Sequence, residues 1–443
     1  MLLNQLFSKK LILFLSDIIT GNSVKGKLDF LLDSDKFSKE QIVDFQNKRL
    51  QLLIKHAYDT VPYYQNLMNV NGLKPQDIHG IKDLHKLPLL TKSIIKEEGL
   101  DRFSSKGFPA AKTMKQSSSG STGEPLFYTT TKEAYSMNLA ANLRGWYWMG
   151  YSLGDKYIKL SQNPRKAPLK RLQDFFSNNL YLATNPLVDN NFEFILHQVE
   201  KFEPKIIRCY PDPLLMLARY KLERRSCTFT PHAITTTGNT LFPETRKEIE
   251  DAFGCKIFDS YSCEGNSTVF ECPTHTGYHS AEEYGISEVI DKGGNPVSNG
   301  IGKLISTDLW NLAHPFIRYD TQDLVEIDSE PCACGRSHLK IKRIIGRDND
   351  IIETPKNRFI VHNFTSFFSR QDLPTFGKIE KFQVRKFEHS VVFNLVVNEA
   401  YDSEAENFLI NYWEKEMGMK IEVSLKKEIE LTSSGKHKFI ING

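Results

Sequence analysis

Hydrophobic and polar positions change their spacing several times along the chain. Within residues 1–100 the apolar side chains recur at helical spacing, most clearly over residues 41–58, where a long amphipathic helix is predicted. Residues 87–92 look extended and predict the entry to another helix. From about residue 126 to residue 305, short apolar runs alternate with helical stretches, which predicts strands at residues 205–209 and 233–236 and helices at residues 213–224 and 243–253. This alternation predicts an α/β fold with largely parallel sheets.

The pattern changes twice more toward the C-terminus. Several short apolar runs joined by Gly, Asn and Pro turns predict a β-rich subdomain, with strands at residues 286–290, 302–307 and 324–327. From about Asp348, a helix at residues 404–416 lies among strand candidates at residues 383–385, 391–397 and 420–424. We therefore predict a large N-terminal domain over residues 1–346 and a small α+β domain over residues 347–443.

Composition excludes several classes of protein. The 443 residues include 29 Phe and 17 Tyr, too much burial potential for a disordered chain. The net charge of +3 lacks the basic bias of a dedicated nucleic-acid binder. The most apolar N-terminal run, residues 11–15, is far shorter than the about 20 residues of a membrane span, although a first helix resting on a membrane surface stays open. Seven dispersed cysteines argue against a disulfide scaffold, so we expect a cytoplasmic protein.

A Ser- and Gly-rich stretch at residues 116–125 is the first candidate site. Glycines let a ligand approach the backbone, while hydroxyls and amide N–H groups can surround a phosphate. The stretch is not a Walker A loop, because no Gly-Lys-Ser/Thr follows it. A flexible linker is the alternative, but the apolar Leu126 and Phe127 that follow at once favour a phosphate loop.

Two later turns carry an aromatic residue or carboxylates after a predicted strand or apolar run. Tyr261 and Glu264 follow the predicted strand at residues 256–258, where a ring could stack on a base and a carboxylate could hold Mg²⁺. Asp323 lies in a charged turn and could accept hydrogen bonds from both hydroxyls of a ribose. Taken alone, each pattern also fits an ordinary turn with solvated carboxylates.

Cysteine and histidine spacing predicts a metal site. Cys332 and Cys334 form a Cys-x-Cys pair, and Cys272 lies close to two histidines, His275 and His279. Three thiolates and one imidazole supply the four ligands of a structural zinc, with no open position for catalysis. The alternative is a set of buried thiols with two surface histidines.

In combination and in this order, the motifs resemble those of the adenylate-forming superfamily. The closest resemblance is to its phenylacetate-CoA ligase-like branch, which includes relatives tied to capsular polysaccharide synthesis. It covers nearly the whole chain and rests on residues 49–64, 87–92, 117–123, 210–213, 237–239, 261–264, 271–272, 317–323, 346–350 and 434–436. This resemblance implies ATP-dependent activation of a carboxylic acid to an acyl-AMP, followed by acyl transfer to coenzyme A.

The resemblance implies a role for each matching residue. The loop around the ATP phosphates would comprise Ser118, Ser119, Gly120, Ser121, Thr122 and Gly123. The adenine pocket would involve Gly238, Asn239 and Tyr261, and the ribose would be held by Asp323. Glu264 would bind Mg²⁺, and Arg347 would approach the ribose or a phosphate beside a hinge near Asn349. Lys436 would reach the site during adenylation, and a zinc would be bound by Cys272, His279, Cys332 and Cys334, since His279 matches the family position better than His275.

The sequence departs from the family pattern at several positions, which leaves the acyl acceptor open. Glu124 stands where a lysine is common, Asn349 replaces the first Asp of the hinge pair, and residues 353–358 replace an apolar-Gly-Val-Asn stretch. The acceptor could therefore be coenzyme A, a carrier or a sugar in cell-envelope polysaccharide synthesis, and a non-catalytic binding protein on the same fold is the alternative. A basic stretch between Lys156 and Arg171 could receive the 3′-phosphate of coenzyme A or an acidic carrier, or form a solvated loop. A homodimer is a further candidate partnership.

Overall fold

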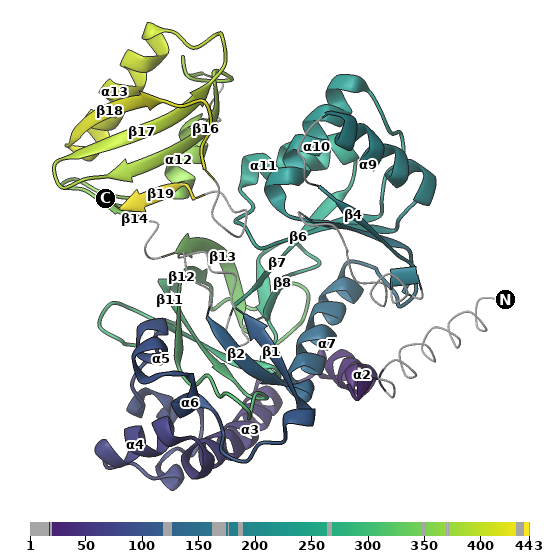
Figure 1. The fold of residues 1–443 in the computed structure, drawn as a ribbon, viewed down its shortest axis with the longest axis vertical. Helices are drawn as coiled ribbons and strands as arrows, with labels where there is room; N and C mark the ends of the chain where they lie inside the picture. Colours follow the sequence, from purple (N-terminus) through teal and green to yellow (C-terminus); the bar gives the residue numbers. More distant parts are fainter. Residues whose placement is uncertain are drawn as a thin grey trace.

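Figure 1 presents the computed structural model of the chain. It describes residues 17, 20–117, 126–161, 174–175, 177–184, 189–263, 268–347, 351–368, 370, 372–430 and 438–442. Among these residues, no helix combines the length and the apolar character needed to cross a membrane.

One mixed sheet of eleven strands organises the large domain, in the order β10-β11-β12-β13-β9-β8-β7-β6-β5-β3-β4. Its parallel half comprises β3 (Tyr157–Ser161), β4 (Asn179–Ala183), β5 (Ile206–Cys209), β6 (Ala233–Thr237) and β7 (Lys256–Ser262). The sequence-based strands at residues 205–209, 233–236 and 256–258 are confirmed, as is the predicted parallel arrangement.

The antiparallel half continues the same sheet beyond β7. It comprises β8 (Thr268–Glu271), β9 (Tyr278–Ser280), β10 (Gly285–Ile290), β11 (Gly300–Asp308), β12 (Tyr319–Ile327) and β13 (Lys340–Arg347). The strands predicted within residues 286–327 are present, but they do not form a sheet of their own. They pair through β13 and β9 back to the parallel strands, so the β-rich region is an extension of the main sheet.

Helices cover both faces of the parallel strands. Figure 1 shows α9 (Asp189–Phe202), α10 (Pro211–Arg224) and α11 (Pro243–Phe253) gathered beside β4 and β6. Their apolar faces bury Leu196, Leu217 and Phe253 against the alternate strand residues Ile207 and Ile234. The long helix α7 (Lys132–Trp148) contacts β8 and packs its C-terminal end against another cluster with Phe258 and Phe270.

The N-terminal helices form the second large core, together with the ends of the antiparallel strands. The helix predicted over residues 41–58 is α3, which a reciprocal capping box between Ser38 and Gln41 starts. Two cations lie against Trp310, with Lys27 Nζ 3.8 Å and Arg49 Cζ 4.0 Å from the ring centroid. The elements of this N-terminal region are α2 (Val24–Ser34), α3 (Lys39–Thr60), α4 (Pro62–Val70), η1 (Pro75–Asp77), η2 (Ile81–Lys86), α5 (Lys92–Glu98), α6 (Leu100–Phe103), η3 (Ala110–Lys112), β1 (Thr113–Ser117) and β2 (Phe127–Thr131).

The C-terminal residues build a four-stranded sheet with its own core, standing apart from the main sheet in Figure 1. Trp413 packs against Phe364 and Phe393 in an aromatic cluster. Strands and helix predicted beyond residue 380 are confirmed in place. The elements are β14 (Ile351–Glu353), β15 (Arg358–Ile360), α12 (Val361–Phe368), β16 (Ile379–Lys386), β17 (Ser390–Val397), α13 (Ser403–Met417), β18 (Lys420–Leu425) and β19 (Ile440–Asn442).

Candidate functional site

Tyr261 and Asp323 meet, although 62 residues separate them in the sequence. Tyr261 lies near the end of β7, and its hydroxyl donates a 2.6 Å hydrogen bond to Oδ2 of the buried Asp323 in β12. Burial, aided by the neighbouring Asp323 carboxylate, raises the pKa of Tyr261 well above its usual value. The phenol therefore stays protonated and remains a donor to the carboxylate.

The turn after β6 is fixed against the start of α10. Gly238 has φ +86°, and a Cβ at this position would lie 2.5 Å from Cε1 of Tyr210. The next residue, Asn239, donates a 2.6 Å hydrogen bond from Nδ2 to Oδ2 of Asp212. Only glycine combines this backbone conformation with such close contact to a ring. Two separate sequence motifs, residues 210–213 and 237–239, are thus one structural unit.

A buried arginine joins two more of the motifs. Arg318 donates a 2.6 Å hydrogen bond from Nη1 to the carbonyl oxygen of Leu87, and its Nη2 lies 3.1 Å from Oε1 of Glu288. Leu90 also forms an isolated parallel bridge with Tyr319. The segment at residues 87–92 therefore holds the strand that carries Asp323.

Several predicted site residues lie outside the described residues. They are Ser118, Ser119, Gly120, Ser121, Thr122 and Gly123 of the loop, Glu264, Lys436, and the hinge position Asn349. On either side of the loop residues, Ser117 in β1 pairs with Phe127 in β2. The backbone of Arg347 ends β13 and pairs with Asp323. The structure thus describes the anchoring strands of these residues.

The predicted metal ligands converge on one point. One ligand atom each from Cys272, His279, Cys332 and Cys334 lies within 4.8 Å of all the others. Tetrahedral zinc with Zn–S bonds of about 2.3 Å needs sulfur atoms about 3.8 Å apart. The Cys272 and Cys332 sulfurs are 3.4 Å apart, and Nε2 of His279 is 3.1 Å from Sγ of Cys334. This donor set fits a metal ion.

The protonation of these groups also suits a metal. Burial lowers the pKa of His279 to about 4, so its imidazole is in the neutral form that binds metals. Burial opposes ionisation of Cys332, but hydrogen bonds from Thr276 and the backbone N–H of Cys334 outweigh it and lower the pKa of its thiol to about 6. A thiolate is therefore available near neutral pH.

The two histidines differ in their contacts. His275 turns away from the cysteines: its Nδ1 lies 3.0 Å from Oε1 of Glu271, and its ring packs 4.6 Å from that of Phe258. His279 alone of the two joins the cluster.

Sequence reasoning missed a buried ionic cluster beside the metal ligands. Glu283 accepts a 2.8 Å hydrogen bond from Nη1 of Arg144 and lies 2.7 Å from Nε2 of His338, and all three side chains are at most 1% exposed. Positive charge from Arg144 and His338 outweighs burial and lowers the pKa of Glu283. Arg144 lies in the helix α7, and its neighbours in the sequence do not indicate that its side chain is buried in an ionic cluster.

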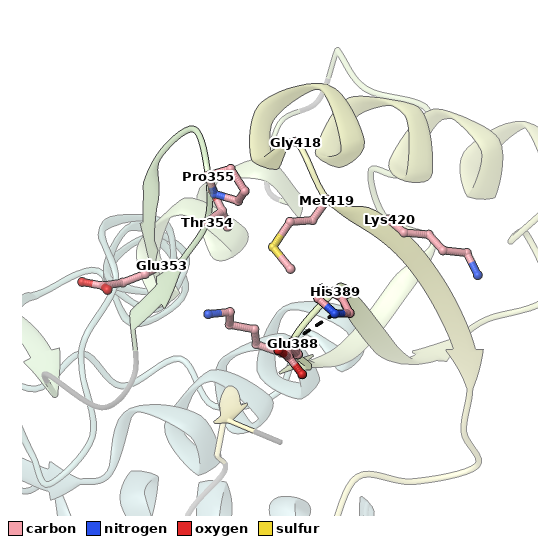
Figure 2. A pocket seen from close by; sticks show the side chains of 9 residues that line it. Glu353, Thr354, Pro355, Glu388, His389, Gly418, Met419 and Lys420 are labelled. Carbon is pink, nitrogen blue, oxygen red and sulfur yellow. Dashed lines mark ion pairs between the residues drawn. The ribbon is translucent and has the colours of Figure 1, made fainter.

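A shallow pocket of about 370 Å³ lies on the C-terminal domain, away from these groups (Figure 2). Met419 points toward its middle, while Glu353 and Lys420 extend outward at opposite ends. Its charges are mixed, and the Glu388–His389 ion pair is long at 3.9 Å. The lining residues are Glu353, Thr354, Pro355, Lys386, Glu388, His389, Gly418, Met419 and Lys420.

Comparisons with known proteins agree with this architecture. The chain is 26% identical over 340 residues to a phenylacetate-coenzyme A ligase of Thermus thermophilus, covering 71% of this chain and 72% of that protein. It is 23% identical over 465 aligned positions to Protein CapK of Staphylococcus aureus, covering 100% of this chain and 99% of that protein. No protein-family model matches the chain.

Solved structures share the fold. A crystal structure of 2-hydroxyisobutyryl-CoA ligase in its postadenylation state overlaps with a TM-score of 0.74 at 15% identity, covering 92% of this chain and 91% of that one. The same ligase in its thioesterification state gives a TM-score of 0.61. Sequence and fold therefore confirm the resemblance to the adenylate-forming superfamily and its phenylacetate-CoA ligase-like branch.

The contact between Gly238 and Tyr210 generates the first prediction. Gly238→Ala should lower the free energy of unfolding by about 1–3 kcal/mol, because alanine is strained at positive φ and its methyl group would meet the ring. Thermal unfolding checks this, with Gly72→Ala as the control, since Gly72 also has positive φ but no atom within 4 Å of the added Cβ. Equal losses in the two variants would contradict a specific role for the ring contact.

The metal cluster generates the second prediction. Cys334→Ser should reduce bound metal from about one ion per chain and lower the melting temperature, because metal binding contributes directly to folding stability. Metal analysis of protein purified without added metal, together with thermal unfolding, checks this. Cys255→Ser is the control, because Cys255 lies outside the cluster. Metal-free protein whose melting is unaffected by Cys334→Ser would contradict the assignment.

Proposed function

We propose that this chain, which is similar to adenylate-forming ligases in both sequence and fold, uses ATP to convert a carboxylic acid to an acyl-AMP and passes the acyl group to coenzyme A. The arrangement that carries the proposal is the Tyr261–Asp323 pair beside the Gly238 turn. Two of these three groups lie at the carboxyl ends of parallel strands, where open α/β sheets bind ligands. Relatives named as CoA ligases support the acceptor.

Each residue has a proposed role in holding ATP. Asp323 accepts hydrogen bonds from the ribose hydroxyls, and Tyr261 orients its carboxylate while lining the adenine pocket with Gly238 and Asn239. The loop from Ser118 to Gly123 surrounds the phosphates, and the strands that flank it, β1 and β2, pair with each other. Arg347, whose backbone pairs with Asp323, approaches the ribose or a phosphate.

The reaction needs charge neutralisation more than acid–base chemistry. The substrate carboxylate attacks the α-phosphate, and pyrophosphate leaves, so two anions must come together. A Mg²⁺ held by Glu264 would lower the repulsion between them. Lys436 supplies a positive charge beside the α-phosphate, and the binding loops hold the reactants in line.

We propose that the small domain carries Lys436 in and out of the site. The proposed boundary separates residues 1–346 from residues 347–443, with the hinge near Asn349. Support comes from the separate aromatic core of the C-terminal residues. Phe242, just after the Gly238 turn, makes an edge-to-face contact with Phe439, three residues beyond Lys436, at a centroid distance of 5.9 Å. This contact joins the described residues after Lys436 to the segment that follows the Gly238 turn.

The metal is proposed to be a structural Zn²⁺. Its four protein ligands would leave no position for substrate, and soft thiolates favour zinc over magnesium or calcium. A reducing cytoplasm is the proposed location, because all seven cysteines are free thiols. A homodimer stays a prediction.

A second acceptor is favoured by the departure of residues 353–358 from the family pattern. This departure supports acyl transfer to a sugar or carrier as the runner-up. The decisive test of activation itself is pyrophosphate release over a panel of carboxylic acids. Absence of pyrophosphate with every acid would favour a non-catalytic binding protein.

The ribose assignment generates the third prediction. Asp323→Asn should weaken ATP binding by about 1.5–3 kcal/mol, because a charged hydrogen-bonding partner is lost. Tyr261→Phe should weaken it less, because it removes only the hydroxyl that orients the carboxylate. Titration of each variant with ATP checks this, and unchanged ATP affinity in Asp323→Asn would show that the ribose assignment is wrong.

The lysine assignment generates the fourth prediction. Lys436→Ala should slow adenylation at least about 100-fold, roughly 2.7 kcal/mol in the barrier, with little change in ATP affinity, because the charge acts in the transition state. Acyl transfer from a pre-made acyl-adenylate should survive. Lys438→Ala is the matched control, two residues away and exposed. Equal pyrophosphate release by wild type and Lys436→Ala would refute the role.

A further inference from the structure

A half-buried arginine stands in the parallel sheet without an acidic partner. Arg208 lies in β5 between Lys159 of β3 and Thr235 of β6, which are its Cα partners on either side. Within the described part of the chain, no carboxylate forms an ion pair with its guanidinium, and the phenol groups of Tyr210 and Tyr157 lie near it. Removing a cation from water without a counter-ion is costly, so this site favours an anion.

The position of Arg208 ties it to the proposed nucleotide site. Side chains two residues apart on a strand share one face, at a spacing of about 6.6 Å. Arg208 therefore faces the same side as Tyr210, whose ring contacts Gly238. Thr235 and Thr237 of β6 likewise share one face of the sheet, and Thr237 is the residue before the Gly238 turn. By strand alternation Arg208 lies one pleat below the Tyr210–Gly238 contact on one sheet face, whereas Tyr261 of β7 lies on the opposite face.

Further down that face, aromatic side chains cover the strands β3 and β5. Tyr157 pairs with Ile206 one pleat below Arg208, and Trp146 packs on Tyr157 at 5.0 Å and on Tyr151 at 5.2 Å between ring centroids. Trp146 and Tyr151 are core residues here, each at most 9% exposed. Along this face, Arg208 therefore lies between the aromatic side chains around Trp146 and the Gly238 turn.

Two neighbouring acidic side chains have partners other than Arg208. Asp259, between Phe258 and Ser260 in β7, points to the other face, where it bonds to Thr236 and Tyr278. Glu271 accepts hydrogen bonds from Arg246 and from the backbone N–H of Asp259. Lys159 is the Cα partner of Arg208 on β3, and its Nζ lies 5.9 Å from the ring centroid of Tyr181.

We propose that Arg208 binds a second negatively charged group on the acyl substrate, at the end opposite the carboxylate that is activated. This inference rests on the proposed ligase function and names its substrate class: a short acid with an additional carboxylate or phosphate-type oxyanion. A guanidinium recognises either group through paired N–H donors, and a charge-assisted bond is about twice as strong as a neutral one.

The test compares matched acids in the pyrophosphate-release assay with full-length protein. Butyrate is paired with succinate, pentanoate with glutarate and hexanoate with adipate, and a phosphono acid of each length distinguishes a carboxylate from a phosphate-type group. In at least one pair, the acid with a second charged group should have a kcat/KM at least about tenfold above that of its partner with a single carboxylate. Arg208→Gln should reduce that ratio at least about tenfold, through the KM for the acid rather than for ATP.

Using the ratio protects the test against a partly unfolded variant, because both acids report on the same protein. Arg219→Gln is the matched control: Arg219 is exposed on α10 and paired with Glu248, so the ratio should stay as in wild type. Pyrophosphate release that is indifferent to the second charge would overturn this inference and leave the ligase function standing. A rise in the KM for ATP in Arg208→Gln would assign the arginine to the nucleotide instead. No release by wild type with any acid would contradict the ligase function, and this inference with it.

Discussion

The 2.6 Å hydrogen bond between Tyr261 and Asp323 depends on strong curvature of the main sheet. Their strands, β7 and β12, are separated in the sheet order by β8, β9 and β13. In a flat sheet, four spacings of about 4.8 Å would place these strands about 19 Å apart. The antiparallel half must therefore curl until β12 faces β7. Register shifts on both sides of β12, between Leu324 and Val325 among others, supply the bending that bulges produce.

Two features stabilise the curl from inside. The concave side is filled by an apolar cluster that includes Val269, Leu304 and Ile341, with Tyr261 packed against it. The metal ligands come from the strands that separate β7 from β12: Cys272 follows β8, His279 lies in β9, and Cys332 precedes β13. A bound metal would thus tie together the segments whose curvature brings Tyr261 to Asp323. Its effect on the nucleotide site would be indirect and structural.

Buried charge connects this region to the N-terminal helices. Glu283, between β9 and β10, bonds to Arg144 of α7 and Ser34 of α2. Arg336, two residues beyond Cys334, lies 3.2 Å from Asp35 and stacks near Trp148. Removing one partner from such a group leaves an uncompensated charge, which is far more costly than losing a surface ion pair. Charged side chains therefore hold the C-terminal end of helix α2 to the segment that carries Cys332 and Cys334.

Local sequence was enough to predict the elements, because helical and alternating apolar spacing depend on neighbouring residues alone. The helix predicted at residues 243–253 is α11 with the same bounds, and the Cys and His residues proposed as ligands do converge. Tertiary structure decided what depends on distant contacts. It placed the strands of residues 286–327 in the main sheet, brought His279 rather than His275 into the cysteine cluster, and left Arg208 half-buried with no ion pair among the described residues. Strand order, curvature and the burial of a charge arise from pairings between segments far apart in the chain, and no local spacing encodes them.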